Sequence, residues 1–554
     1  MKEKVIWGTG WIAAKYVGTL RHNDISFFID SDIEKKGKTF LGRPVKMPDE
    51  IKSWDNIVIY IQINFYEEIA ELLRKKNLVE GRDFLKYDEP KLIEIDDIDQ
   101  DCDSVYEFLR SDKSLGGKIW CWGSLLGFHK SYNIFYKKLY ESLHEEYTVI
   151  SDAVYINQLE SAERSGSSVY VLPKIFAADM LRPIVRKENA DYSVILQEKY
   201  PELMEIAKEY EGIYSDLENG EAHLFTYKQA SFIEKMLLSF RPKGVIILCS
   251  FPTSHRILAV LCKKQGIPVI YTHKGALPKT WALEIGGEMG ESLPAVYSDV
   301  FKMLPVNADE MEEAKDVWKY LNESRINRKI QPQNNWKSRV CYRIKKNRPI
   351  IFYAGLNDTQ SGLAYYGENA RIYHSPMFSS SMEAVPFLAD LAKKNDWNLL
   401  YKPHPMYRPT EEQKNSFPDN VIYVDAADIN DVIDFSDVTI TILSSTAYVA
   451  LIRKKPVVML GYNQLRRKDC TYEAFTKDNI DFAISSAINE GFSQKQQDAF
   501  TKHIAQLLKY YLYADLEVGA VTFGKPLPKN INDVYELSEL VCGKSCLLTE
   551  READ

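Results

Sequence analysis

With 554 residues, 45% of them hydrophobic and 27% charged, the chain can bury the cores of about three to four soluble domains. Its net charge of -8 argues against general nucleic-acid binding, which needs a basic surface. No apolar run reaches the roughly 18–20 residues of a membrane span, and residues 1–8 lack the apolar segment of a signal peptide, so we expect a cytoplasmic protein.

Residues 1–90 predict a small Rossmann-like module. Its strand-like and helix-like runs are residues 5–7, 25–29, 57–63 and 67–76. Gly8 and Gly10 follow the first strand, where glycine permits a tight turn, and Asp30 follows the second, about 20 residues on, where a dinucleotide-binding domain places its ribose-binding acid. Because Ala13 replaces the third glycine of that fingerprint, we favour a structural or docking role for the module over bound NAD.

The next segment, residues 91–117, is acidic and weakly patterned, and we interpret it as a linker. Asp101 and Asp103 have the spacing of a metal-binding pair, but no strand leads into them, so a solvated acidic run is the better interpretation. Cys542 and Cys546 lie near each other with no second pair of Cys or His beside them. We therefore expect no metal site.

A second α/β domain is expected over residues 118–330. Its strand-like and helix-like runs are residues 118–122, 147–150, 168–172, 224–240, 244–249, 254–265 and 267–271. The last three give a strand, a helix and a strand, which is the pattern of a βαβ unit. A polar, glycine-rich loop then covers residues 272–292 and leaves the carboxyl end of a parallel strand, where α/β folds place their ligands.

A third α/β domain, followed by C-terminal helices, is expected over residues 331–554. Its predicted strands and helices are residues 349–354, 380–395, 399–402, 420–424, 429–435, 438–442, 447–453 and 456–460. After residue 485 a helical pattern continues to residue 513. Two α/β domains that face each other across a linker would bring the carboxyl ends of their strands together.

Groups suited to binding a phosphate gather at strand ends of this third domain. They are Lys402, His404, Pro405, Ser444, Ser445 and Thr446. An imidazole, paired hydroxyls and the N–H groups where a helix begins can together bind an anion without a metal. A structural histidine or a plain helix cap would explain either cluster alone, whereas both clusters in one α/β domain favour a phosphate site.

These motifs resemble those of known enzyme families. The run Lys402-Pro403-His404-Pro405 and the later Ser444-Ser445 resemble the HP and serine motifs of bacterial sialyltransferases and capsule-type Kdo transferases. A similar pair occurs in the CDP-glycerol polymerases of teichoic acid synthesis, whose usual D-Y-S-S is replaced here by Ile442-Leu443-Ser444-Ser445. Residues 437–461 and the loop at 273–292 are most similar to capsular polysaccharide synthesis proteins, and the whole resemblance spans residues 240 to 475.

The resemblance implies an α/β fold with two Rossmann-like domains in a GT-B arrangement, preceded by the small N-terminal Rossmann-like domain. It implies a metal-independent glycosyltransferase that moves a sugar, Kdo or another nonulosonic acid, from a CMP-sugar to a bacterial surface polysaccharide or a lipid-linked acceptor. No cofactor would be required. The expected partners are the nucleotide-sugar donor, the glycan or lipid-linked acceptor, capsule assembly proteins and a second copy of the chain, at the inner face of the plasma membrane.

In this interpretation the six phosphate-compatible residues of the third domain hold the donor, with Lys402 adding positive charge. Asp425 and Asp428 are candidates for the ribose or the cytosine, and a helix cap explains them equally well.

The facing domain would supply the general base that removes the proton of the acceptor hydroxyl. Glu288 and Glu284 come first, because a carboxylate in a glycine-flanked loop can reach the substrate, and His273 follows them. A solvated loop carboxylate is the plainer interpretation of each glutamate. The candidates for acceptor binding are Lys274, Gly275, Asn357 and Asp358, with Arg256 as a further cation for an acidic acceptor.

Four other functions stay open. A CDP-glycerol-type polyol-phosphate transferase shares the cytidine donor. A UDP-sugar epimerase-like enzyme has a similar fold, although no catalytic acid cluster for it is identified. A non-catalytic capsule assembly protein and an NAD-dependent oxidoreductase built on Gly8 and Gly10 are the remaining alternatives.

Overall fold

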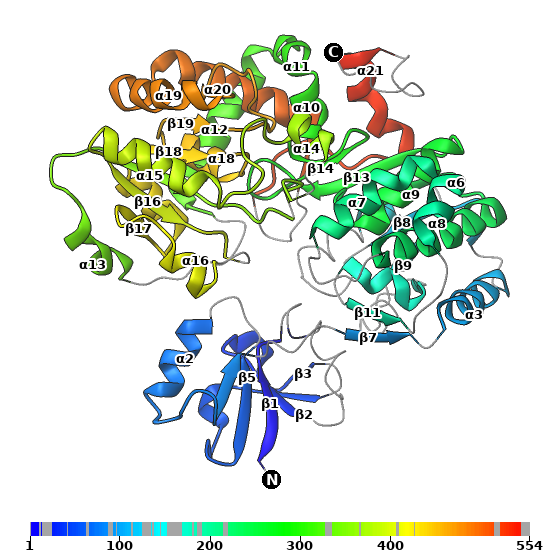
Figure 1. Ribbon diagram of the computed structural model, residues 1–554. Helices are drawn as coiled ribbons and strands as arrows, with labels where there is room; N and C mark the ends of the chain where they lie inside the picture. The colour runs from blue at the N-terminus through cyan, green and yellow to red at the C-terminus, as the bar shows by residue number, and fades with distance from the viewer. Residues whose placement is uncertain are drawn as a thin grey trace. The chain divides into compact units, whose positions relative to one another are not determined.

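The computed structural model describes residues 2–9, 13, 25–40, 43–61, 66–86, 92–95, 97–111, 115–123, 135, 138–143, 146–151, 169–179, 182–185, 191–213, 220–326, 335–359, 361–364, 367–405, 409–425, 427–514 and 521–543. Within these residues helices and mostly parallel strands alternate, which confirms the expected α/β class (Figure 1). None of the described helices combines the length and the apolar character needed to cross a lipid bilayer.

The chain divides into two compact units, which we describe separately. Unit 1 comprises Met1–Lys137, Glu146–Leu203 and His223–Val245, and unit 2 comprises Lys138–Glu145, Met204–Ala222 and Ile246–Asp554. The predicted domain boundaries at residues 90, 117 and 330 stay a prediction.

Unit 1 begins with a six-stranded sheet in the order β3-β4-β2-β1-β5-β6. The elements are β1 (Glu3–Trp7), β2 (Ile25–Ile29), β3 (Thr39–Phe40), β4 (Arg43–Lys46), β5 (Ile57–Ile61), α2 (Tyr66–Arg74) and β6 (Phe84–Lys86). Only β3 runs antiparallel to its neighbour. Val5 and Ile6 enter different buried clusters, because alternate side chains of a strand point to opposite faces. The helix predicted after Gly10 lies outside the described residues except at Ala13.

The segment interpreted as an acidic linker is in fact structured. It forms β7 (Leu92–Ile95), which pairs with β11 (Arg182–Val185), and helix α3 (Ile98–Ser111). One face of α3 buries apolar side chains, while Asp99 and Asp103 on its acidic face pair with lysines of helix α8 (Glu221–Phe240). Acidic residues of this segment thus form ion pairs with α8, so the segment is not a solvated acidic run.

The rest of unit 1 contains a second set of parallel strands in the order β10-β9-β8. These elements are β8 (Ile119–Trp122), β9 (Tyr147–Ser151), β10 (Val169–Val171) and helix α6 (Tyr192–Lys199).

Unit 2 contains strands in the order β12-β13-β14-β21. The elements are β12 (Gly244–Leu248), α9 (Thr253–Lys264), β13 (Val269–Lys274), β14 (Thr280–Glu284) and β21 (Leu512–Ala514). The predicted βαβ unit is present, but the stretch predicted as a loop, residues 272–292, contains β14, which is buried and pairs antiparallel with β13. The helix predicted to reach residue 513 ends earlier, in a π-helical turn at Leu507–Tyr511, because residues 512–514 pair with β14 instead.

The second sheet of unit 2 is fully parallel, in the order β17-β16-β15-β18-β19-β20. Its strands are β15 (Ile350–Ala354), β16 (Asn398–Lys402), β17 (Val421–Tyr423), β18 (Val438–Thr441), β19 (Val457–Met459) and β20 (Tyr472–Glu473). Most of them are short runs rich in apolar and β-branched residues, because helices cover both faces.

Two layers of helices cover this sheet (Figure 1). Helices α15 (Ala384–Lys394) and α19 (Lys477–Glu490) pack on the face that carries Ile351 and Tyr353. The helices on the opposite face are α12 (Ala308–Ser324), α17 (Ile429–Phe435), α18 (Thr446–Ile452) and α20 (Gln494–Gln506). The core on that face also includes Ala282 and Leu293, so the segment after β13 shares one core with the third predicted domain.

Short helices complete unit 2. They are α7 (Met204–Ile213), α10 (Leu293–Val296), α11 (Ser298–Met303), α13 (Trp336–Val340), α14 (Glu368–Tyr373), α16 (Glu411–Asn415) and α21 (Glu536–Cys542).

Candidate active site

The parallel sheet of unit 2 reverses its winding between β15 and β18. The chain adds β16 and β17 on one side of β15, then returns to place β18, β19 and β20 on the other side. Loops leaving the carboxyl ends of strands at such a point diverge, and open α/β sheets bind ligands there. The described parts of these loops are residues 355–359 and 442–445, and at their start Thr441 Oγ1 donates to the Ala354 carbonyl at 3.3 Å.

Ser444, Ser445 and Thr446 lie half-buried where β18 gives way to α18. The Ser444 Oγ accepts the Thr446 N–H at 3.1 Å and lies 3.0 Å from Thr446 Oγ1. Ser445 makes no side-chain cap bond to the helix. A local cap therefore accounts for Ser444, whereas the Ser445 hydroxyl is not used to hold α18.

The predicted histidine motif follows β16, the strand on the other side of β15. Lys402 ends this strand and is 5% exposed, while His404 and Pro405 lie half-buried beyond it. Gly355 packs tightly here, since a Cβ added to it would be 3.1 Å from the Pro403 Cα. The ends of β16 and β18 thus carry the predicted phosphate-binding segments, and the end of β15 between them leads to the acceptor candidates Asn357 and Asp358.

The two aspartates proposed for the ribose or the cytosine have local partners. Asp428 caps α17 by accepting the Asn430 N–H at 2.8 Å, which is the helix-cap alternative. Asp425 Oδ1 accepts the Tyr423 hydroxyl at 3.2 Å. Their predicted contact with a nucleotide stays a prediction.

Asp358 is buried behind the loop that leaves β15. Its carboxylate oxygens accept the Ser381 N–H at 3.0 and 3.2 Å. Burial raises the pKa of Asp358 to about 6, more than these hydrogen bonds lower it. Asn357, half-buried beside it, accepts the Thr359 hydroxyl at 2.7 Å. Asp358 therefore orders the loop, and Asn357 is the more accessible of the two acceptor candidates.

The catalytic candidates His273 and Glu284 lie together on β13 and β14. In the antiparallel register His273 opposes Ala282, so Glu284 is its diagonal neighbour on the same face. His273 Nε2 is 3.5 Å from Glu284 Oε1 and 3.3 Å from the Tyr511 hydroxyl, which donates to that same oxygen at 2.7 Å. Burial lowers the pKa of His273, but Glu284 and Glu288 outweigh it and the pKa is raised.

Glu288 follows β14, and its side chain is buried against the residues that follow β12. Its Oε1 accepts the Ser250 N–H at 3.0 Å, and burial raises its pKa despite the opposing effect of His273. The residue before Ser250 is Cys249, whose φ of 63° is in the left-handed region that residues other than glycine rarely adopt. Neither Glu288 nor Glu284 is a solvated loop carboxylate, so the plainer interpretation of both is wrong.

The acceptor-side candidates Lys274 and Gly275 have packing roles. Lys274 lies directly opposite Trp281 in the strand pair, with its Nζ 3.9 Å from the centroid of the indole ring. A Cβ at Gly275 would overlap Thr280 Oγ1, so the turn requires glycine for space. Arg256 forms an ion pair with Glu209 on α7.

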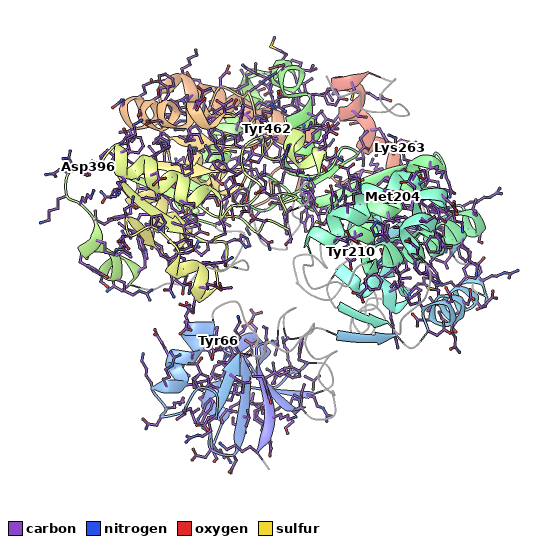
Figure 2. The ribbon with its side chains drawn as sticks, in the orientation of Figure 1. Tyr66, Met204, Tyr210, Lys263, Asp396 and Tyr462 are labelled. Carbon is purple, nitrogen blue, oxygen red and sulfur yellow. The ribbon has the colours of Figure 1, made fainter. Side chains whose placement is uncertain are left out.

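His374 is a buried residue that the sequence interpretation missed. It follows helix α14, and its Nε2 is 3.6 Å from Glu291 Oε1. Its carbonyl accepts the N–H of Tyr462, labelled in Figure 2, at 2.8 Å. No strand leads into His374, and its only signal is a His-Ser-Pro sequence close in type to His404-Pro405.

The predicted dinucleotide acid of the N-terminal module is held by its own turn. Asp30 accepts hydrogen bonds from the Thr9 N–H at 3.1 Å, from the Thr9 hydroxyl and from Lys35 at 3.0 Å. Burial raises its pKa, but the bonds from Thr9, Asp32 and Lys35 outweigh burial and lower it. Gly8 has a φ of 115°, and Gly10 lies outside the described residues.

In the part of the chain that the structure describes, no three His, Cys, Asp and Glu side chains are grouped so as to hold a metal ion.

Two family models match parts of the chain. Residues 1–82 match the C2185-like N-terminal family, and residues 371–478 match the CDP-glycerol:poly(glycerophosphate) glycerophosphotransferase family. The second match contains His374, His404, Ser444 and Ser445. No curated protein matches the chain.

Solved structures that match include two transferases of Thermosulfurimonas dismutans KpsC. Its β-Kdo 2,7-transferase is 16% identical, with 51% of this chain and 81% of that chain covered and a TM-score of 0.33. Its β-Kdo 2,4-transferase is 13% identical, with 54% and 87% covered and a TM-score of 0.35. UDP-GlcNAc 2-epimerase from Neisseria meningitidis is 12% identical, with 70% and 93% covered and a TM-score of 0.24.

All three TM-scores lie below 0.5, so the functional argument rests on the residues of the site and on the family model. Kdo transferases and CDP-glycerol enzymes, two of the three kinds of protein in the predicted resemblance, are both among the proteins to which this chain is similar.

Proposed function

We propose that the chain is a glycosyltransferase with a cytidine-nucleotide donor. It moves a sugar, Kdo or another nonulosonic acid, to a bacterial surface polysaccharide or a lipid-linked acceptor. One observation carries the proposal: His404 and Ser444-Ser445 follow the strands on either side of β15, at the point where the sheet reverses its winding. The same residues lie inside the segment that is similar to a CDP-glycerol enzyme family.

The donor phosphate is the chemical reason for these residue types. Hydroxyl and imidazole N–H groups donate to phosphate oxygens, and Lys402 adds positive charge. As the bond between the sugar and the phosphate breaks, the nucleotide leaves with the electron pair, and these groups stabilise the charge that develops. No cofactor is needed for this step.

The general base that accepts the proton of the acceptor hydroxyl is expected on β13 and β14 of unit 2. We assign it to His273, with Glu284 as the carboxylate that stabilises the imidazolium and orients the ring. Glu288 is the second candidate, because its raised pKa suits a group that takes up a proton. Both oxygens of Glu284 accept hydrogen bonds, from Tyr511 and from the Leu293 N–H, which favours a positioning role for it.

A polyol-phosphate transferase is the second candidate function, because the family model that matches residues 371–478 is of that class. In that reaction the acceptor oxygen attacks phosphorus and the nucleotide again leaves with the electron pair. The donor-side residues would be the same, and the identity of the transferred group separates the two.

Equilibrium binding of CMP, CDP, UDP and NAD, followed by calorimetry, tests the proposal. We expect saturable binding of CMP or CDP that is lost in His404→Ala. The matched control is His503→Gln, because His503 is buried on α20 and its Nε2 is 3.0 Å from the Tyr448 hydroxyl. NAD binding lost in Gly10→Asp would support the oxidoreductase instead.

A screen of CMP-, CDP- and UDP-sugars and CDP-glycerol, with products weighed by mass spectrometry, identifies the donor. Turnover with UDP-sugars alone would contradict the cytidine assignment. If no nucleotide binds, the assembly-protein alternative is favoured.

A further inference from the structure

One ring nitrogen of the buried His374 imidazole forms no hydrogen bond with the described residues. The residue is 2% exposed, and its Nδ1 has no hydrogen-bond partner among the described residues. Buried polar atoms are almost always paired in native proteins, so an unpaired one requires an explanation. An apolar side chain of similar size would pack at this position without that cost.

The carboxylate of Glu291 fixes one side of the ring. Glu291 Oε1 is 3.6 Å from Nε2, and the ring packs against Phe251 with 5.6 Å between centroids at an angle of 70°. A carboxylate near Nε2 favours a proton on that nitrogen. Nδ1 is then the nitrogen of His374 that remains for a ligand, and it donates to a phosphate oxygen when the ring is an imidazolium with a proton on both nitrogens.

Three glycines from three loops pack closely against His374 and the residue before it. A Cβ at Gly461 would overlap the His374 carbonyl oxygen, and one at Gly362 would be 2.8 Å from its Nε2. A Cβ at Gly290 would overlap the carbonyl of Tyr373, the preceding residue. The loops that leave β15 and β19 therefore approach His374 itself, and the loop that leaves β14 approaches the residue before it.

Gly461 packs between the backbone of His374 and the segment that leads to the donor-side serines. A Cβ added to Gly461 would overlap the His374 carbonyl oxygen and would be 3.1 Å from the Ile442 carbonyl oxygen. Ile442 lies two residues before Ser444. A second buried polar atom close by, Ser250 Oγ, is likewise unpaired among the described residues, and it precedes the Phe251 ring that packs on His374. Two unpaired polar groups, one on His374 and one on the residue before the ring that packs against it, indicate a missing polar ligand.

We propose that His374 binds a phosphate oxygen of the donor nucleotide through Nδ1, with Glu291 holding the ring. This inference rests on the proposed cytidine-nucleotide donor. It adds His374 to the donor-binding residues and gives the loop at 285–292 a role on the donor side as well as the acceptor side. The group recognised is the phosphate, so a free phosphate ion and the nucleotide are to be distinguished by the test.

Two amide substitutions separate the two ring nitrogens. The side-chain nitrogen of His374→Asn lies near the place of Nδ1, and that of His374→Gln near the place of Nε2. We expect His374→Asn to keep CMP affinity within a few-fold of the parent chain, and His374→Gln to weaken it roughly tenfold or more, the usual cost of a hydrogen bond to a charged group. Cytidine, which lacks the phosphate, should bind both variants equally well, and inorganic phosphate alone should compete with CMP but not with cytidine.

Thermal unfolding checks that each variant is folded. If either amide variant does not fold, Glu291→Gln replaces it, and the expected result is weaker CMP binding with cytidine binding unchanged. His503→Asn and His503→Gln are the matched controls, because His503 is also buried with an unpaired Nδ1 but packs against the aromatic rings of Phe301 and Tyr448.

Parent-like CMP affinity in both His374 variants would overturn the inference by showing no contact. A loss only in His374→Asn would overturn it by showing a contact through Nε2. If CMP binding is lost in His404→Ala while both His374 variants bind normally, the inference fails and the proposed function stands. If the parent chain binds no cytidine nucleotide, both fail.

Discussion

The Tyr511 hydroxyl donates a 2.7 Å hydrogen bond to Glu284 Oε1, across 227 residues of sequence. The other oxygen of Glu284 accepts the Leu293 N–H at 2.7 Å, at the start of α10. Glu284 is 1% exposed, so both bonds form away from water, where they hold the carboxylate beside His273. The C-terminal segment, through β21 and the turn before it, is thus part of the candidate catalytic group.

Replacing Tyr511 with Phe should reduce turnover more than it reduces substrate affinity. Glu284 would lose one buried donor, at a cost of about 1–3 kcal/mol in stability, and would no longer hold His273 in one orientation. The measurements are the free energy of unfolding in urea and kcat separately from KM. Tyr510→Phe is the control, because its exposed hydroxyl donates only to the Pro305 carbonyl. Equal effects of the two variants would contradict the positioning role of Tyr511.

Ser444 and Ser445 should respond differently to alanine. Ser444→Ala removes the oxygen that accepts the Thr446 N–H, so stability should fall by about 1 kcal/mol together with nucleotide affinity. Ser445→Ala removes no bond that holds α18, so stability should be unchanged while affinity falls. Thermal unfolding and CMP titration on the same samples give both quantities. An unchanged CMP affinity in Ser445→Ala would remove Ser445 from the donor site.

The parallel strands of unit 2 are predictable from sequence because they are buried on both faces. The predicted strand at 438–442 is observed at Val438–Thr441, and the run at 350–354 is observed at Ile350–Ala354. Such strands appear as short runs of apolar and β-branched residues, which a local sequence pattern detects. The phosphate-compatible residues were found for the same reason, since they directly follow these strands.

The features that the sequence did not reveal depend on distant partners. Strand β14 is a short mixed run whose neighbour β21 lies more than 200 residues later, and a local pattern carries no trace of that pairing. The helical pattern that contains Tyr511 continues into the residues of β21, so the pattern alone does not separate Tyr511 from a plain helix. His374 follows no strand, so nothing in its neighbourhood marks it as part of a site. Helix α3 resembles an acidic linker in sequence, because the lysines of α8 that pair with its acidic face lie more than 100 residues away in the chain.

The stability of the chain should fall as pH rises from about 4 to about 6, through Asp358. Burial raises the pKa of its carboxyl from 3.8 to about 6, so in this interval the folded state binds a proton that the unfolded state has released. Asp358→Asn should remove this pH dependence. The unfolding free energy of the variant relative to the parent chain should therefore change by on the order of 3 kcal/mol between pH 4 and pH 7. Urea unfolding at several pH values measures it.

Asp396 provides the control for Asp358. It is the exposed carboxylate labelled in Figure 2, and the side-chain hydrogen bond from Lys345, followed by the charge of Arg348, lowers its pKa. Asp396→Asn should therefore produce a small effect of the opposite sign. A slope that survives in Asp358→Asn would show that another group is responsible.

Lys468→Met should be among the more destabilising single substitutions in unit 2. The Lys468 Nζ donates to the carbonyls of Pro294 at 2.8 Å, Ser298 at 3.0 Å and Arg466 at 3.2 Å, and the residue is 2% exposed. Methionine fills the volume but leaves those carbonyls without a donor, so we expect a loss of about 3 kcal/mol or more in the free energy of unfolding.

Lys302→Met is the matched control for that substitution. Lys302 forms an exposed ion pair with Asp469, which should contribute less than about 1 kcal/mol. Because Lys468 ties the segment after Glu291 to the loop that follows β19, Lys468→Met should also weaken CMP binding at temperatures where the protein is still folded. A variant with parent-like unfolding but weaker CMP binding would instead assign Lys468 to the donor site directly.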